Sequence, residues 1–410
     1  MSDSTGRSGP QVYSIAAHRG FADALVAGLV PRYNEDGFGL ARLTLLLPSS
    51  RAVRTVSEAF IRHYGAANEV GGLLMPRMAV VGDLGLDEAL GPLLDPLGAT
   101  EIPAAVDPVA RWLRIAALLQ EEMGGDAPGG SALLRLAGDM AATMDRMLVE
   151  DIGPEELLGD RVLDLFEHNL ANHWQASLRL FSRVQARWLS ELGEAGQLDA
   201  AARRSRLFDH AAKKWQATPP ATPIVAVGVT SAAPALARML RAVSDLPQGA
   251  VILPDLDLSM PDDVWNELGV AGAPEVLGDP FFERGDAVTH PQYHLKLLLN
   301  RMGVARGEVR QWHRKGDAAA PPERTHAISS LFLPPEASQS WIDLPPEKRR
   351  LSGVRLMESA GPEEEAQAIA LLVREAVAEP EKRVVVVTPD RGLARRCAYG
   401  HCCTRISCLS

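Results

Sequence analysis

The stretch that comes closest to a phosphate-binding loop runs from residue 43 to residue 60, LTLLLPSSRAVRTVSEAF. Residues 43–47 form a nearly continuous apolar run, which is typical of a strand buried on both faces of a parallel sheet. A short turn follows, and residues 51–60 then show helical spacing. NTPases hold phosphates with this order of elements, because the loop N–H groups and the helix N-terminus face the anion.

The side chains that would hold a triphosphate are missing from this loop. A P-loop needs glycines for close backbone approach, a lysine for the β- and γ-phosphates, and Ser or Thr for Mg²⁺. Pro48, Ser49, Ser50 and Arg51 include no glycine and no lysine, and none of the six lysines in the chain follows a glycine. These four residues have the position of a nucleotide loop without its chemistry, that is, a degenerate nucleotide loop. On the residues alone we favour an ordinary first βα unit of a doubly wound sheet, since fold does not fix function.

Two further pairs of residues have types suited to chemistry. Asp255 and Asp257 follow an apolar strand, where metal–nucleotide sites carry an acid, but aspartate also favours turns, and we interpret both as turn residues. His290 and His294 are four positions apart and could share a helix face with a metal. No third ligand is evident, so capping and packing are the expected roles. The sequence predicts no catalytic residue, no metal site and no cofactor held by this chain.

All four cysteines, Cys397, Cys402, Cys403 and Cys408, fall in the last 14 residues. Their spacing is not a C-x2-C zinc or redox pattern, although a metal site that includes His401 is an alternative. Helical periodicity stops at residue 396, where the cysteines begin. We interpret residues 397–410 as a tail produced by a frame shift or truncation, and expect it to be unpacked.

The charge balance gives no general support for nucleic-acid binding, because the formal net charge is −10. Any such contact needs a local patch. The candidates are Arg51 and Arg54, at the expected carboxyl edge of a sheet, and Arg203 and Arg204, on a basic helix. No apolar run approaches a membrane span and the N-terminus lacks a signal peptide, so the expected location is the cytoplasm, with no membrane partner.

The elements that would position these residues alternate between strands and helices. Apolar runs predict strands at 12–17, 43–47, 73–81, 224–229 and 249–254, and the connections between them predict a parallel sheet with right-handed crossovers. Three amphipathic stripes predict a helical subdomain inserted at about 105–215, whose first helix is capped by Asp107.

The domain organisation follows from these patterns. We expect a disordered N-terminus at 1–11 and an α/β domain at 12–302. A proline-rich linker is expected at 303–353, and a second α/β domain begins at 354–396 with strands at 354–358 and 383–388. The predicted fold class is therefore α/β, a parallel sheet with a helical insertion followed by the start of a second sheet.

Several segments resemble, in order and spacing, the alphaproteobacterial AddB family. They are residues 43–60, LLMPRMAVV at 73–81, GVTSAAPALARMLRAVSDLPQGAVILPDLD at 228–257, HPQYHLKLLLNRMGV at 290–304 and VVVVTPDRGLARR at 384–396. AddB is the second subunit of the AddAB helicase–nuclease, which processes DNA double-strand breaks for homologous recombination. The resemblance implies a superfamily 1 helicase-like scaffold whose ATP site has decayed, with residues 43–60 in the place of helicase motif I and 228–236 near motif III.

The resemblance also implies partners for this chain. It further implies a nuclease activity whose motif is missing from this sequence. The partners would be an AddA-type helicase–nuclease subunit and double-stranded DNA ends, and the complex would use ATP and Mg²⁺ through parts not present here. Family members carry a C-terminal nuclease with a Glu/Gln-x-Lys motif, and no lysine of this chain fits it.

The expected function is thus a non-catalytic, DNA-contacting scaffold that is truncated before the nuclease. The alternative is a Rossmann-like nucleotide-binding transferase, which would require a glycine-rich turn that residues 227–230 approach with one glycine. A poorly folded product without function is a third possibility.

Overall fold

The structure is a computed structural model of the chain. It describes residues 9–66, 74–81, 102–156, 171–274 and 280–312, then 327, 329–331, 333–349, 351, 353–380, 382 and 384–399. The chain forms two compact units, Met1–Arg350 and Leu351–Ser410, each of which is considered by itself.

The first unit is built on a sheet that has six strands among the described residues, all parallel, in the order β3-β2-β4-β5-β1-β6. The strands are β1 (Val12–Ile15), β2 (Thr44–Leu47), β3 (Arg77–Val80), β4 (Ile224–Val227), β5 (Gly249–Pro254) and β6 (Arg310–Gln311). The predicted parallel α/β fold is therefore confirmed. β3 is an edge strand that begins directly after Pro76, the position at which proline interferes least with a sheet.

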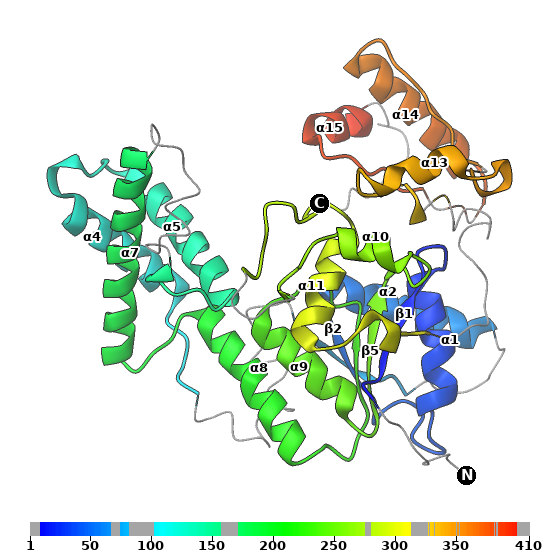
Figure 1. Ribbon diagram of the computed structural model, residues 1–410, viewed down its shortest axis with the longest axis horizontal. Helices are drawn as coiled ribbons and strands as arrows, with labels where there is room; N and C mark the ends of the chain where they lie inside the picture. The colour runs from blue at the N-terminus through cyan, green and yellow to red at the C-terminus, as the bar shows by residue number, and fades with distance from the viewer. Residues whose placement is uncertain are drawn as a thin grey trace. The chain divides into compact units, whose positions relative to one another are not determined.

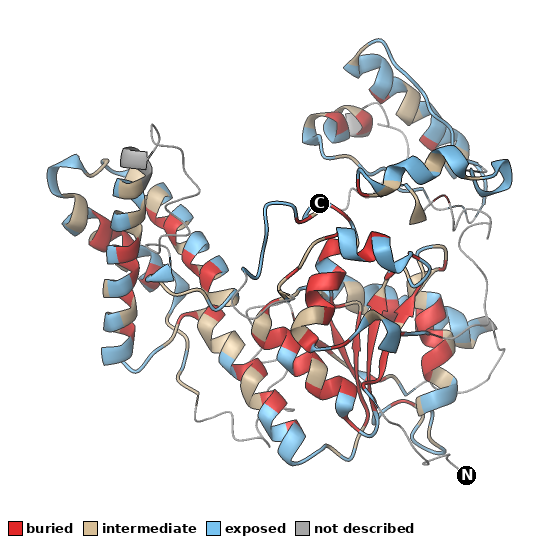
Figure 2. Ribbon diagram, in the orientation of Figure 1, coloured by how far each residue is buried: buried red, intermediate tan, exposed pale blue. Residues whose placement is uncertain are grey.

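Helices cover both faces of this sheet (Figure 1). One face carries α1 (Phe21–Tyr33) and α2 (Ser50–Ala66), and the other carries α8 (Ala200–Ala217), α9 (Pro234–Asp245) and α11 (Tyr293–Met302), with the short α10 (Asp262–Glu267). In β2 the side chains of Leu45 and Leu47 join the first face and Leu46 joins the second, all fully buried. The apolar run at 43–47 is therefore continuous because both of its faces are covered, as Figure 2 shows for the central strands.

The helical insertion forms a small core of its own. It consists of α4 (Pro108–Met123), α5 (Ser131–Val149) and α7 (Ala171–Glu194), whose buried residues make a separate apolar cluster. Asp107 caps α4 as predicted, accepting hydrogen bonds from the backbone N–H groups of Val109 (3.0 Å) and Ala110 (2.8 Å). The predicted insertion extended to 215, but Leu207, Phe208 and Trp215 of α8 pack into the sheet core, so α8 is part of the sheet layers.

Polar contacts join the helices of the insertion. Arg111 of α4 lies 2.9 Å from Asp145 of α5 and 2.7 Å from Asp199, which precedes α8. Asp199 is 1% exposed and also accepts a hydrogen bond from the indole Nε1 of Trp188 on α7. Burial raises the pKa of Asp199, and the nearby Arg111 guanidinium opposes that rise. This buried ion pair links three helices at the base of the insertion.

The ordered part of the first unit extends beyond the predicted domain limits at both ends. Gln11 is buried and its backbone N–H donates to Ser244, so the predicted disorder at 1–11 does not extend to this residue. The predicted linker begins too early as well, because β6 pairs with β1 and Trp312 is buried in the core. A strand of two residues gives no periodicity that the sequence could reveal. Short helical turns at Ala337–Gln339, α13 (Ser340–Asp343) and Pro346–Arg349 occupy part of the remaining linker.

The described residues of the second unit include the helices α14 (Pro362–Val377) and α15 (Arg391–Tyr399), around a small core of Ala366, Leu393 and Cys397. Asp390 caps α15 through the backbone N–H groups of Gly392 and Leu393, which lower the pKa of its carboxyl. Cys397 is buried in this core, so the predicted unpacked tail does not begin there. Cys402, Cys403 and Cys408 lie outside the described residues.

The two strands predicted in the second unit are not formed. Residues 354–358 and 384–388 are assigned to no strand, and Leu356 and Val387 are 89% and 90% exposed. An apolar run becomes a strand only when neighbouring backbone satisfies its N–H and C=O groups, and no described residue of this unit does so. The second α/β sheet predicted from these runs is therefore absent from the described part of the chain.

Candidate functional site

The carboxyl edge of the sheet is the place where an open α/β fold binds ligands, at the points where neighbouring strands continue in opposite directions. The connections after β1 and β2 run one way across the sheet, with α1 and α2 on one face. The connections after β4 and β5 run the other way, with α9 and α11 on the opposite face. Two crevices follow from this arrangement, one between β2 and β4 and one between β5 and β1.

The β2/β4 crevice begins at the predicted nucleotide loop, of which Pro48 is a lining residue. It is lined by Leu47 and Pro48 on one side and by Val227 and Gly228 on the other, with a volume of about 450 Å³. Ser49 closes the loop by capping α2, because its Oγ accepts a hydrogen bond from the Ala52 N–H (3.3 Å). The polar side chain that a phosphate could meet therefore has a structural partner within the chain.

Apolar and paired groups line the rest of the β2/β4 crevice. A Cβ on Gly228, whose φ is +66°, would lie 3.5 Å from the ring of Phe21, so this ring lies directly over the glycine. Asp23, on the same rim, forms an ion pair with Arg62 (2.7 Å). Among the described residues that line this crevice, Arg62 is the single cationic side chain, and no lysine is present. The one cationic side chain among these lining residues is therefore already paired with a carboxylate.

The two pairs of arginines predicted to contact DNA lie in different settings. Arg51 and Arg54 are exposed on the first turns of α2, beside the β2/β4 crevice, and Arg54 forms an exposed ion pair with Glu58 (3.3 Å). Arg203 is half-buried, and its Nε donates to the carbonyl of Pro103 (2.9 Å). Desolvation lowers the pKa of Arg204, which is also half-buried. Arg51 and Arg54 are thus more accessible to an anionic ligand than the second pair.

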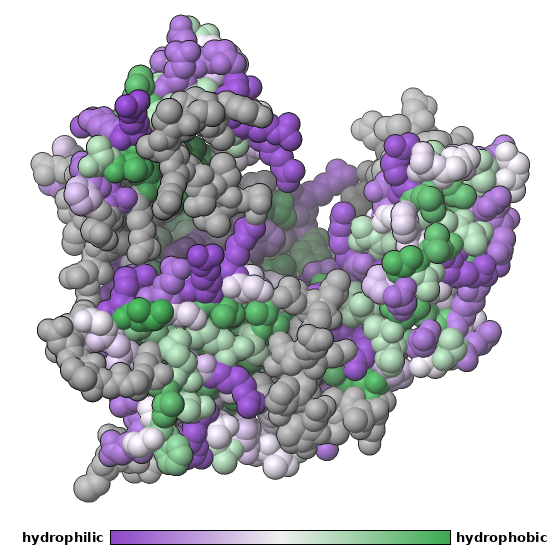
Figure 3. Space-filling model, turned by 180° about the vertical axis from the view of Figure 1, so that it is seen from behind, coloured by the Kyte–Doolittle hydropathy of each residue, from purple (hydrophilic) through white to green (hydrophobic). Residues whose placement is uncertain are grey.

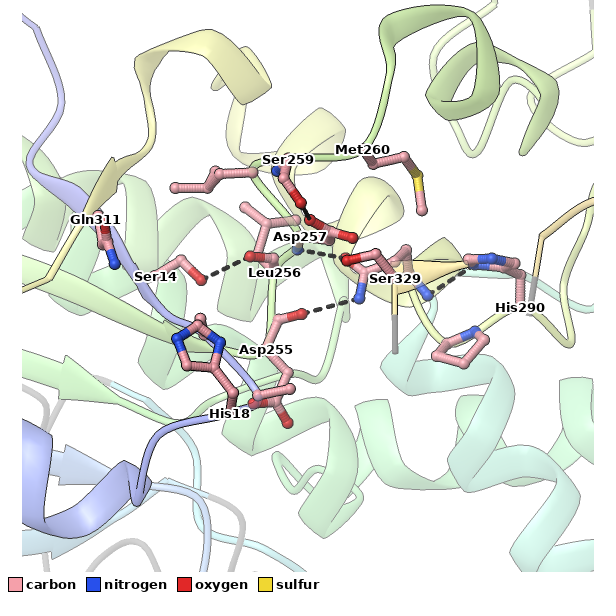
Figure 4. A pocket seen from close by; sticks show the side chains of 15 residues that line it. Ser14, His18, Asp255, Leu256, Asp257, Ser259, Met260, His290, Gln311 and Ser329 are labelled. Carbon is pink, nitrogen blue, oxygen red and sulfur yellow. Dashed lines mark hydrogen bonds between the residues drawn. The ribbon is translucent and has the colours of Figure 1, made fainter. Parts of the chain in front are cut away.

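The β5/β1 crevice, also of about 450 Å³, was not predicted from the sequence. β1 and the residues after it contribute Ser14 and His18, and the residues after β5 contribute Asp255 and Asp257 (Figure 4). The segment before α11 contributes Gln292 and His290. The sequence signal that could have indicated this crevice was the pair of aspartates directly after an apolar strand. The sequence does not show that these aspartates lie beside residues some 240 positions earlier.

His290 and His294 lie in different settings. The Nδ1 of His290 accepts a hydrogen bond from the Gln292 N–H (3.1 Å) just before α11 begins, but no side chain caps α11 at Gln292, and His294 is exposed in the first turn of the helix. Among the described residues, no group of three His, Cys, Asp or Glu side chains is arranged to hold a metal ion. Asp257 is a turn residue as predicted, since its Oδ1 accepts from both the N–H and the Oγ of Ser259.

Comparison with known proteins identifies no family for this chain. A scan against protein-family models finds no match, and a search of the curated proteins finds none. Within the described part of the chain, every helix is too short or too polar to cross a membrane. Conclusions about function therefore depend on the residues at the carboxyl edge of the sheet.

Proposed function

We propose that this chain is a non-catalytic scaffold that contacts DNA. It would be part of an AddAB-type helicase–nuclease subunit that acts in the cytoplasm in double-strand break repair by homologous recombination. The observation that carries the proposal is the β2/β4 crevice of a parallel sheet. There the loop in the position of a phosphate-binding loop is closed by its own serine cap and lies beside Phe21. In this proposal, the sheet would keep the layers of a nucleotide-dependent motor without the groups that bind a triphosphate.

DNA contact is assigned to Arg51 and Arg54. They lie at the N-terminal end of α2, where backbone N–H groups and guanidinium groups together favour a phosphate. The net charge of −10 disfavours binding elsewhere without a local cluster of this kind. In this proposal ATP and Mg²⁺ act through an AddA-type partner, and this chain orients the DNA end.

The test measures binding of a blunt-ended DNA duplex by fluorescence anisotropy at several salt concentrations. Each lost phosphate contact reduces the slope of log K against log[salt] by about 1, so the Arg51→Ala/Arg54→Ala variant is expected to lose about 2 from this slope. The matched control is Arg135→Ala/Arg146→Ala, which removes two exposed arginines of α5 and the same charge. The Arg203→Ala/Arg204→Ala variant is expected to act mainly on the stability of the chain and little on the slope of log K against log[salt].

Two results would overturn the proposal. One is the absence of salt-dependent DNA binding by the wild-type chain, or a slope that is equal in the α2 and α5 variants. The other is ATP hydrolysis or Mg²⁺-dependent cleavage by the isolated chain. Co-purification with an AddA-type subunit would test the partner separately.

A Rossmann-like nucleotide-binding transferase is the second candidate. The observation in its favour is the β5/β1 crevice, whose volume falls within the range of small-molecule sites and whose position follows the switch-point rule. It lacks a glycine-rich phosphate turn. Thermal stabilisation of the chain by nucleoside triphosphates would favour this candidate over the scaffold.

A further inference from the structure

The backbone on the β5 side of the β5/β1 crevice is held in one conformation by hydrogen bonds from both sides. The Asp255 N–H donates to Ile15 of β1 (2.9 Å), and the Ser14 Oγ donates to the carbonyl of Leu256 (3.0 Å). The amide of Gln292 donates to the Asp255 carbonyl and accepts from the Asp257 N–H, both at 2.9 Å (Figure 4). The position from which the Asp255 side chain leaves the backbone is therefore fixed before any ligand binds.

The carboxylate of Asp255 is a polar group of the crevice that takes no part in these hydrogen bonds. Its backbone adopts φ +56°, in the left-handed region, which aspartate tolerates better than most residues. Among the described residues, neither a hydrogen bond nor an ion pair engages its carboxylate oxygens. Although the residue is exposed overall, the crevice removes water from the carboxylate and raises its pKa. A carboxylate in this state gains most from a ligand that donates hydrogen bonds to it.

The other lining groups restrict the chemistry of that ligand. No lysine or arginine occurs among the described residues that line the crevice, and Asp257 adds a second carboxylate. A phosphate would therefore be repelled. Leu256, Met260 and Pro291 supply apolar surface, and the half-buried imidazole of His18 supplies a flat one. The crevice suits a flat, uncharged heterocycle with N–H donors on one edge.

We propose that the β5/β1 crevice binds a nucleobase with an exocyclic amino group, which donates to the Asp255 carboxylate while any phosphate stays outside. Adenine, cytosine and guanine carry such a group, and carboxylate side chains accept hydrogen bonds from it in base recognition. The proposal goes beyond DNA contact at α2, because it concerns a different crevice and a contact that does not involve phosphate.

The experiment measures binding of free adenosine, cytidine, guanosine and thymidine to the full chain by isothermal titration calorimetry, together with the triphosphates of the first three. At least one amino-bearing nucleoside is expected to bind, thymidine is not, and added phosphates are expected to weaken binding. The Asp255→Asn variant keeps the size of the side chain and suits the left-handed backbone. It is expected to lose about 10- to 140-fold in affinity, the range for one charge-assisted hydrogen bond of about 1.5–3 kcal/mol.

The matched control is Asp263→Asn, an exposed aspartate of α10 outside the crevice, which is expected to bind like the wild type. Three results would overturn the proposal: no binding of any amino-bearing nucleoside, equal affinity in Asp255→Asn, or equal or tighter binding of triphosphates.

A single-stranded oligonucleotide distinguishes the source of the base. If Asp255→Asn weakens its binding too, the base comes from a DNA strand; if only nucleoside binding weakens, the ligand is a free nucleoside. Salt-dependent duplex binding is measured in parallel, so failure of the DNA-scaffold proposal is recognised separately.

Discussion

Gly28 of α1 lies directly against the indole of Trp312, which is 284 positions later in the chain. A Cβ on Gly28 would lie 2.5 Å from the Trp312 Nε1 atom. The indole is 1% exposed, donates from Nε1 to the Ala24 carbonyl (3.2 Å) and packs under the guanidinium of Arg32, 4.2 Å from the ring centroid. The contact fixes the segment after β6 onto the face of the sheet that carries α1.

We expect Gly28→Ala to destabilise the first unit. The added methyl group has no room beside a rigid, fully buried indole, and overpacking of this kind costs about 1–3 kcal/mol. The matched control is Gly65→Ala in α2, where a Cβ meets nothing within 4 Å and the higher helix propensity of alanine adds stability. Urea denaturation monitored by tryptophan fluorescence measures both. Equal midpoints for the two variants would contradict the close packing of Gly28 and Trp312.

The Ser49 hydroxyl is expected to act through stability and not through a ligand. Ser49→Ala removes the hydrogen bond to the Ala52 N–H and should cost about 1 kcal/mol. Ser49→Asp restores an equally good cap and should recover most of the stability. Chemical denaturation with and without ATP and Mg²⁺ checks this expectation. A midpoint shift with ATP that disappears in Ser49→Ala would mean that the serine binds phosphate.

Acid is expected to weaken the helical insertion through Glu191. Both carboxylate oxygens of Glu191 accept from Arg114, at 2.6 and 2.8 Å, and these hydrogen bonds lower its pKa from the ordinary value of 4.5. A lowered pKa means that the contribution to stability is present above about pH 4.5 and is lost as pH falls through the folded-state pKa. Because the pair is partly exposed, we expect at most about 1 kcal/mol.

The measurement compares the denaturation midpoints of the wild type and Glu191→Gln at pH 7 and at pH 3.5. The difference between the two proteins should be largest at pH 7 and should shrink in acid. Glu194→Gln serves as the control, since Glu194 is exposed one turn further along α7. If both variants showed the same pH dependence, Glu191 would not be the responsible carboxylate.

Residues 384–388 are expected to tolerate a charge that a sheet strand would not. Val387 is 90% exposed, so Val387→Asp should change stability by less than about 0.5 kcal/mol. The same substitution at Val225 of β4, which is 0% exposed, places an unpaired charge in the core and should prevent folding. Circular dichroism and thermal unfolding compare the two. Unfolding of the second unit by Val387→Asp would show that this segment forms a buried strand after all.

The sequence by itself determined the elements whose signal is local. The apolar runs predicted β2, β4 and β5, because strands covered on both faces are apolar throughout and do not alternate between apolar and polar residues. Asp107 was recognised as a cap from its position before a helix. The loop at Pro48–Arg51 could be predicted to lack phosphate-binding groups, since that absence is a property of residue types alone.

Only the tertiary structure decided which distant segments meet. β6 is two residues long and carries no pattern, and its place beside β1 follows from the burial of Trp312 against Gly28. The β5/β1 crevice requires Ser14 and Asp255 to lie at the same sheet edge, which strand order alone sets. Conversely, the valines at 384–387 have the local signal of a strand but pair with no described segment, and a strand exists only through hydrogen bonds that another segment supplies.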